Sequence, residues 1–119
     1  MNITHTDFIF LHAKDFAEAA AFYTNTLGLK QSKNYERIPG GEFETGNLTI
    51  QILDPAAIGQ EFRAGQAIAL HVENVDEARA ELEAKGVEFK YPTIDSGTCV
   101  QAYFSDPSGN PLILHNRYA

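Results

Sequence analysis

Three histidines are the side chains of this sequence most suited to proton transfer or to binding a transition metal. His12 and His71 each follow a leucine at the end of an apolar run, and His115 lies in the last apolar run. Imidazole ordinarily changes charge near neutral pH and is a common metal ligand. From the residues alone three roles stay open: a shared metal site, hydrogen bonding or proton transfer to a ligand, and no ligand role.

His12 and His71 occupy equivalent places in an internal repeat. The run FIFLHAKDFAEA at residues 8–19 matches AIALHVENVDEA at residues 67–78. Each copy has an apolar run, then Leu-His, then the start of a helix. A repeat near half the chain length indicates that one structural unit is used twice.

The first copy predicts a βαβββ unit. Its apolar run at residues 8–13 alternates as a strand does, and Asp15 with Glu18 forms a capping-box pattern at the start of a helix. Gly28 is expected to end that helix. The strands that follow are expected at residues 29–38, 42–45 and 48–53.

The second copy repeats this order. A strand is expected at residues 67–72, and Asn74 with Glu77 predicts the next helix start. Gly86 is expected to end the helix. The strands that follow are expected at residues 87–91, 98–105 and 111–116.

The repeat predicts an α+β fold with a single domain over residues 1–119. Module one is assigned to residues 1–53, the linker to 54–66 and module two to 67–119. Neither module has enough apolar residues to be stable alone, so the two are expected to join their strands into a curved mixed sheet. Helices would cover its outer face and leave a concave cleft on the inner face.

Composition excludes several classes of partner. The net charge of −7 argues against nucleic acid and anionic membranes. No apolar run is long enough to span a bilayer. Cys99, the single cysteine, cannot form an internal disulfide, which favours a cytoplasmic location. Its thiol has no neighbouring sequence support as a nucleophile and is expected to be inert.

Two motifs resemble the vicinal oxygen chelate superfamily over essentially the whole chain. They are D-x-x-x-A-x-x-F-Y…L-G, beginning at Asp15, and F-x-D-P-x-G-N-x-x-x-L, beginning at Phe104. The superfamily includes glyoxalase I, extradiol dioxygenases, fosfomycin-resistance enzymes and bleomycin-binding proteins. The resemblance implies the paired-module fold, a small organic ligand as partner, and a homodimer.

The resemblance also implies where the metal-dependent members hold their metal. Counting from the motifs, those positions carry Phe8, Gln51, Ala67 and Ile113 in this sequence. A phenyl ring, a neutral amide, a methyl group and a branched alkyl group do not supply the donors that a divalent cation needs. We therefore predict no metal and no other cofactor.

Strand alternation predicts the residues that face the cleft. His12 and His71 lie four residues beyond the first and third metal positions, hence on the same strand face. The expected ligand-binding set is Phe8, Phe10, His12, Gln51, Ala67, His71, Tyr103, Ile113 and His115. Alternatively, Phe8 and Phe10 fill the cleft and leave no pocket. No catalytic residue can be assigned from the sequence.

These observations favour a metal-free protein that binds a small organic molecule in the manner of the bleomycin-binding members. An alternative is a lyase, isomerase or dioxygenase that uses a displaced histidine metal site or histidine acid–base chemistry. A third is a structural or regulatory module without a small ligand. Two questions stay open at this point: whether the protein is an enzyme, and whether the cleft is formed within one chain or across two.

Overall fold

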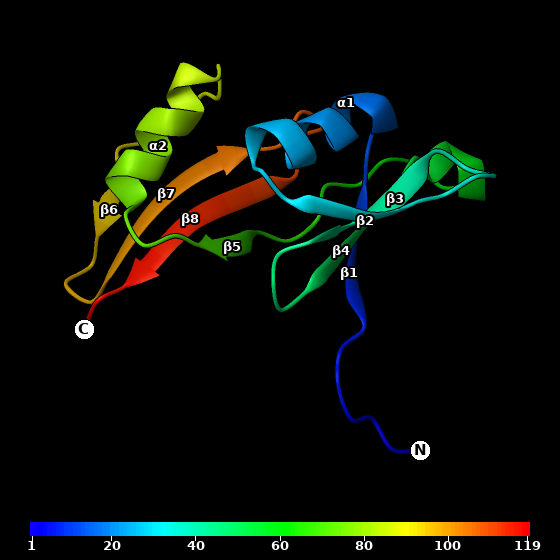
Figure 1. The fold of residues 1–119 in the computed structure, drawn as a ribbon, viewed down its shortest axis with the longest axis horizontal. Helices are drawn as coiled ribbons and strands as arrows, with labels where there is room; N and C mark the ends of the chain where they lie inside the picture. Colours follow the sequence, from blue (N-terminus) through cyan, green and yellow to red (C-terminus); the bar gives the residue numbers. More distant parts are fainter. The chain divides into compact units, whose positions relative to one another are not determined.

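The chain folds into two compact units of related topology. The computed structural model describes residues 1–119, which divide into unit 1, Met1–Arg63, and unit 2, Ala64–Ala119. Each unit is an α+β module with a four-stranded mixed sheet. Figure 1 shows the elements in chain order from blue to red.

Unit 1 contains four strands and a helix that follows the first of them. The helix α1 (Phe16–Ala21) continues into a π-helical turn (Phe22–Thr26), and a 3-10 turn (Pro55–Ile58) follows the last strand. The strands are β1 (Phe8–His12), β2 (Lys30–Asn34), β3 (Gly40–Glu44) and β4 (Thr49–Leu53). Their order in the sheet is β1-β4-β3-β2, with β1 parallel to β4 and the other pairs antiparallel.

The core of unit 1 lies between its helix and one face of this sheet. Phe43 on β3 is fully buried, and its ring lies 5.7 Å from that of Tyr23 and 6.2 Å from that of Phe16. Leu11 on β1 and Ile50 on β4 are buried on the same face. Burying side chains of this size is the main stabilising contribution to such a small unit.

Unit 2 repeats the arrangement with shorter outer strands. Its helix is α2 (Val75–Ala84). Its strands are β5 (Ile68–His71), β6 (Ile94–Asp95), β7 (Cys99–Ser105) and β8 (Pro111–Arg117). The order β5-β8-β7-β6, with β5 parallel to β8, matches the order in unit 1. The structural repeat predicted from the sequence is therefore confirmed.

The core of unit 2 lies under α2, which runs beside β7 and β8 (Figure 1). Leu112 and Leu114 on β8 are buried, as is Leu82 on α2. The rings of Phe89 and Phe104 lie 5.1 Å apart. The guanidinium of Arg79 lies 4.8 Å from the centre of the Phe89 ring, so this side chain covers the outer side of the aromatic pair.

The two predicted helix caps are confirmed. The backbone N–H of Glu18 donates to Asp15 Oδ1 at 3.1 Å, and that of Glu77 donates to Asn74 Oδ1 at 3.0 Å. Both cap residues have extended backbone angles, as N-caps do. The repeat is thus conserved at the level of local hydrogen bonding as well as topology.

The turn between β7 and β8 is held by a buried polar cluster. Asp106 Oδ1 accepts from the backbone N–H groups of Ser108 and Asn110, both at 2.9 Å, and Asp106 Oδ2 accepts from Asn110 Nδ2 at 2.8 Å. Asn110 Oδ1 accepts from the N–H of Gly65 at 2.9 Å. The motif around this turn therefore has a structural function.

Residues 87–91 do not form the predicted strand. The outer strand of unit 2 is β6 instead, beyond Pro92, which has no N–H to donate to a ladder. The carbonyl of Tyr91 accepts from the Arg79 guanidinium at 2.9 Å rather than from a strand. Phe89 is buried against Phe104, so the apolar pattern reflects core packing.

The strands of each module form a four-stranded mixed sheet, and the joining of the two modules into one curved sheet stays a prediction. The predicted strand at residues 29–38 is shorter in the structure, because β2 ends at Asn34 and the chain bends at residues 36–39 before β3. Neither α1 nor α2 has the length and apolar character needed to cross a bilayer.

Candidate functional site

Each sheet has one face under its helix and one face without a helix, which we call its open face. On the open face of unit 1, strand register places Phe10 beside Gln51 and Gln51 beside Glu42. The next row in the same register is Phe8, Thr49 and Glu44. Phe8 is 47% and Phe10 38% exposed, so neither is a core residue.

A hydrogen-bonded chain links the polar residues of the first row. Gln51 Nε2 donates to Tyr35 Oη at 2.9 Å, and Tyr35 Oη donates to Glu42 Oε2. Burial raises the pKa of the Tyr35 phenol above its usual value, and the bond to Glu42 raises it further. Tyr35 therefore keeps its proton well into the alkaline range.

Glu44 has a separate set of donors in the second row. Its carboxylate accepts from the hydroxyls of Ser32 and Thr49, the latter at 2.7 Å. These bonds, Ser32 first, hold the pKa of Glu44 below its usual value. Glu44 is consequently a fixed negative charge at the edge of the unit 1 open face.

His12 lies on the same face of β1 as Phe8 and Phe10, but residues that follow β4 cover it. Its Nδ1 accepts from the backbone N–H of Arg63 at 2.9 Å, and its Nε2 lies 3.2 Å from Gln60 Oε1. The ring also lies 6.1 Å from that of Phe62 and 5.2 Å from that of Phe10. With both ring nitrogens engaged, His12 supports the structure around it.

The open face of unit 2 carries the other two predicted histidines. Register places His71 beside His115 and His115 beside Gln101. The neighbouring row is Ala69, Ile113 and Tyr103. His71 and His115 are thus brought together, as residues paired in register on adjacent strands point to the same face.

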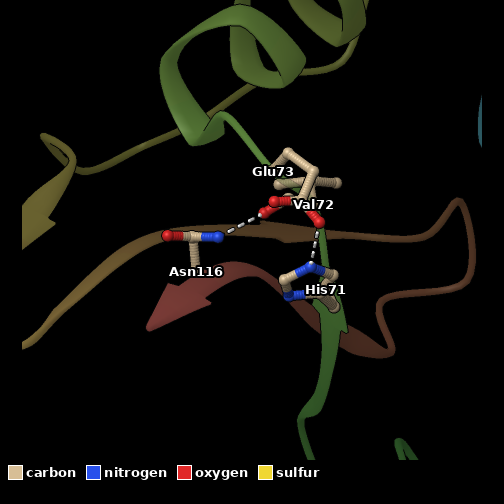
Figure 2. Close-up of polar contacts among 4 residues, drawn as sticks. All are labelled: His71, Val72, Glu73 and Asn116. Carbon is tan, nitrogen blue, oxygen red and sulfur yellow. Dashed lines mark hydrogen bonds and ion pairs between the residues drawn. The ribbon is translucent and has the colours of Figure 1, made fainter. Parts of the chain in front are cut away.

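His71 also has a carboxylate partner. Figure 2 shows His71 Nε2 facing Glu73 Oε1, 3.0 Å away, and Asn116 Nδ2 donating to the carbonyl of Val72 at 3.0 Å. The latter bond fixes the backbone between the two partners. The His71 side chain is 63% exposed, so this pair is accessible to solvent and to ligands.

An open apolar pocket of about 480 Å³ lies at the β6 side of unit 2. It is lined by Tyr91, Pro92, Ile94 and Tyr103. Ile94 pairs with Gln101, so the pocket borders the histidine row. A volume of this size suits a drug-sized or smaller organic molecule.

The residues at the implied metal positions do not fit a divalent cation. Gln51 uses its amide N–H on Tyr35, and Phe8 and Ile113 have no donor atom. Ala67 lies just before β5 and is exposed. No group of three or more His, Cys, Asp or Glu side chains lies close enough together to hold a metal ion.

The structure groups the predicted residues by unit. Phe8, Phe10, His12 and Gln51 share one face of unit 1, while His71, Tyr103, Ile113 and His115 share one face of unit 2. The union of both groups on one concave surface stays a prediction. Sequence reasoning missed the residues that complete the two faces, which are Tyr35, Glu42, Glu44, Tyr91, Pro92 and Ile94.

Solved structures of related fold resemble the chain over almost its full length. A lactoylglutathione lyase from Agrobacterium tumefaciens is 21% identical, with a TM-score of 0.78 over 96% of this chain and 94% of that one. A superfamily member from Sphaerobacter thermophilus is 24% identical, with a TM-score of 0.80 over 95% and 97%. A protein from the mobile metagenome of V. pseudocholerae is 21% identical, with a TM-score of 0.78 over 100% and 98%.

At these identities the likeness establishes the fold alone. The search of curated proteins finds no match. The family model, by contrast, matches residues 3–114, nearly the whole sequence. With the duplicated topology and the two motifs, this match assigns the chain to the Glyoxalase/Bleomycin resistance protein/Dioxygenase superfamily.

Proposed function

We propose that this protein binds a small organic molecule on the open faces of its sheets without a bound metal. The observation that carries the proposal is the apolar pocket of about 480 Å³ at the β6 side of unit 2. Tyr91 is 63% exposed there and Ile94 48%. Neighbouring apolar side chains with this much exposed surface are typical of a binding site. Ligand burial would remove that surface from water.

The metal-free part of the proposal rests on side-chain chemistry. Of the residues at the four implied metal positions, only Gln51 has a side-chain atom that could bind a metal. Its amide is a weak neutral ligand and is already bonded to Tyr35. A carboxylate or an imidazole would be needed there and at the other three positions. A cytoplasmic location and a homodimer remain predictions from the sequence.

The test uses an environment-sensitive dye, 1-anilinonaphthalene-8-sulfonate, added to protein dialysed against EDTA. We expect saturable fluorescence enhancement that Ile94→Asp weakens at least several-fold, because a buried carboxylate opposes apolar contact. Ile58→Asp changes an isoleucine of similar exposure in unit 1 and serves as the control. Equal dye binding by both variants, or no saturable binding, would contradict the proposal.

Acid–base catalysis is the second candidate, and the exposed His71–Glu73 pair favours it. A carboxylate bonded to one ring nitrogen orients the imidazole for proton transfer at the other. A structural relative is a lactoylglutathione lyase, so S-lactoylglutathione is a reasonable first substrate to try. Turnover that His71→Gln abolishes would support this candidate, and turnover unchanged in that variant would exclude His71 as its base.

A further inference from the structure

We propose that Gln51 Oε1 is a positioned hydrogen-bond acceptor for a ligand, and that the unit 1 open face takes flat apolar molecules carrying an N–H or O–H donor. Tyr35 and Glu42 are the positioning residues. This inference rests on the proposed function and adds to it a ligand class and a set of binding residues in unit 1.

The orientation of the Gln51 amide follows from its partners. The Glu42 carboxylate can only accept, so the hydrogen of the Tyr35 hydroxyl points to Glu42. The Tyr35 oxygen is then left with acceptor capacity alone and requires a donor from Gln51. Only the amide nitrogen can supply one, which places Nε2 toward Tyr35 at 2.9 Å.

Fixing Nε2 also fixes Oε1. The amide group is planar, with nitrogen and oxygen on opposite sides of its carbon, so Oε1 points away from Tyr35. The only side-chain hydrogen bond of Gln51 is the one from Nε2 to Tyr35. Gln51 is half-buried and no buried side-chain oxygen lacks a partner, so Oε1 is open to solvent and can accept from a ligand donor in place of water.

The surroundings of Gln51 define the rest of the ligand. Phe10 is its register partner on β1, and Phe8 lies two residues before Phe10 on the same face. Phe8 is 47% exposed and Phe10 38%. Exposed aromatic rings next to one fixed acceptor favour a flat apolar body with a single donor at its edge.

A ligand lacking that donor would leave Gln51 Oε1 buried without a partner. A site with a buried hydrogen-bonding group discriminates strongly against a ligand that lacks the matching donor. An apolar site discriminates much less between ligands that differ only in size. For one neutral hydrogen bond in a half-exposed site we expect a discrimination on the order of tenfold.

Indole and 1-methylindole are the probes, because a single methyl group replaces the N–H donor of otherwise similar rings. Titrations followed by ¹H–¹⁵N NMR give both dissociation constants and the residues that shift. We expect indole to bind about tenfold more tightly than 1-methylindole, with shifts at Phe8, Phe10 and the Gln51 side-chain amide.

Tyr35→Phe removes the hydroxyl that orients Gln51 and should bring the ratio of the two dissociation constants close to one. Tyr118→Phe is the matched control, because Tyr118 donates to the Asp95 carboxylate at 2.5 Å within unit 2, whereas Gln51 belongs to unit 1. This control should keep the wild-type ratio. Gln51→Leu, which keeps the side-chain bulk, tests the same point if Tyr35→Phe does not fold.

A wild-type ratio near one would overturn the inference, whatever the variants do. A ratio preserved in both Tyr35→Phe and Gln51→Leu would overturn it as well. Shifts confined to Tyr91, Ile94 and Tyr103 would also refute it while leaving the proposed function intact, because that result places the ligand in the unit 2 pocket. Weaker dye binding by the Ile94→Asp variant tests the proposed function alone and does not bear on this inference.

Discussion

The ring of His12 accepts a hydrogen bond from the backbone N–H of Arg63 at 2.9 Å, whereas His71, its equivalent in the repeat, faces solvent beside Glu73. His12 is 8% exposed and the His71 side chain 63%. Duplication therefore placed the same residue twice and gave it two roles. His12 fixes the segment after β4, and His71 is available to a ligand.

This difference predicts unequal costs of substitution. His12→Ala removes the partner of a backbone N–H and should lower the free energy of unfolding by about 1–3 kcal/mol. His71→Ala removes an exposed pair and should cost less than about 1 kcal/mol. Chemical denaturation of both variants checks this, and a loss for His12→Ala as small as that expected for His71→Ala would show that His12 has no structural role.

The helix caps predict a second pair of substitutions. Asp15→Ala and Asn74→Ala each remove an acceptor from a backbone N–H in the first helical turn. Each should lower the free energy of unfolding by about 0.5–2 kcal/mol. Asp15→Asn and Asn74→Asp keep an acceptor oxygen and should cost much less. Silent alanine variants would mean that the two caps do not stabilise their helices.

The two faces of the unit 1 sheet predict a third contrast. Phe43→Ala empties a fully buried site and should cost about 3–5 kcal/mol. Phe8→Ala acts on a ring that is 47% exposed and should cost far less. Thermal or urea unfolding measures both. A large loss of stability in Phe8→Ala would place Phe8 in the core and remove it from the ligand face.

Tyr35 predicts a pH dependence at the alkaline end. Its pKa is raised in the folded protein, by burial first and then by Glu42, so folding favours its protonated form. The stability it adds is full below the ordinary tyrosine pKa of about 10 and is lost as pH rises through the folded value. Subtracting the absorbance titration of Tyr35→Phe from that of wild type should give a midpoint above pH 10. A midpoint at or below that value would contradict the Tyr35–Glu42 bond.

Local signals in the sequence predicted much of this fold. The caps at Asp15 and Asn74 and the tight turn after Asp106 depend on residues within five positions of each other, which is why the sequence sufficed. Alternation likewise placed Phe8 and Phe10 opposite Leu11, because side-chain direction in a strand has a period of two.

Long-range contacts explain what the sequence did not show. The segment before Pro92 has the apolar pattern of a strand. In the structure its backbone accepts a hydrogen bond from Arg79, and the ring of its Phe89 packs against Phe104. The covering of His12 comes from residues about fifty positions away, and the Tyr35–Glu42 bond joins the segment after β2 to β3. None of these has a periodic or local signature.

The central claim is that a small organic ligand binds here without a metal. The direct measurement is the dissociation constant for indole before and after dialysis against EDTA, on untagged protein whose metal content is determined in the same samples. We predict well under one divalent metal per chain, and the same dissociation constant and melting temperature in both samples, because no metal-binding free energy would be lost. A stoichiometric metal whose removal abolishes indole binding and lowers the melting temperature would contradict it.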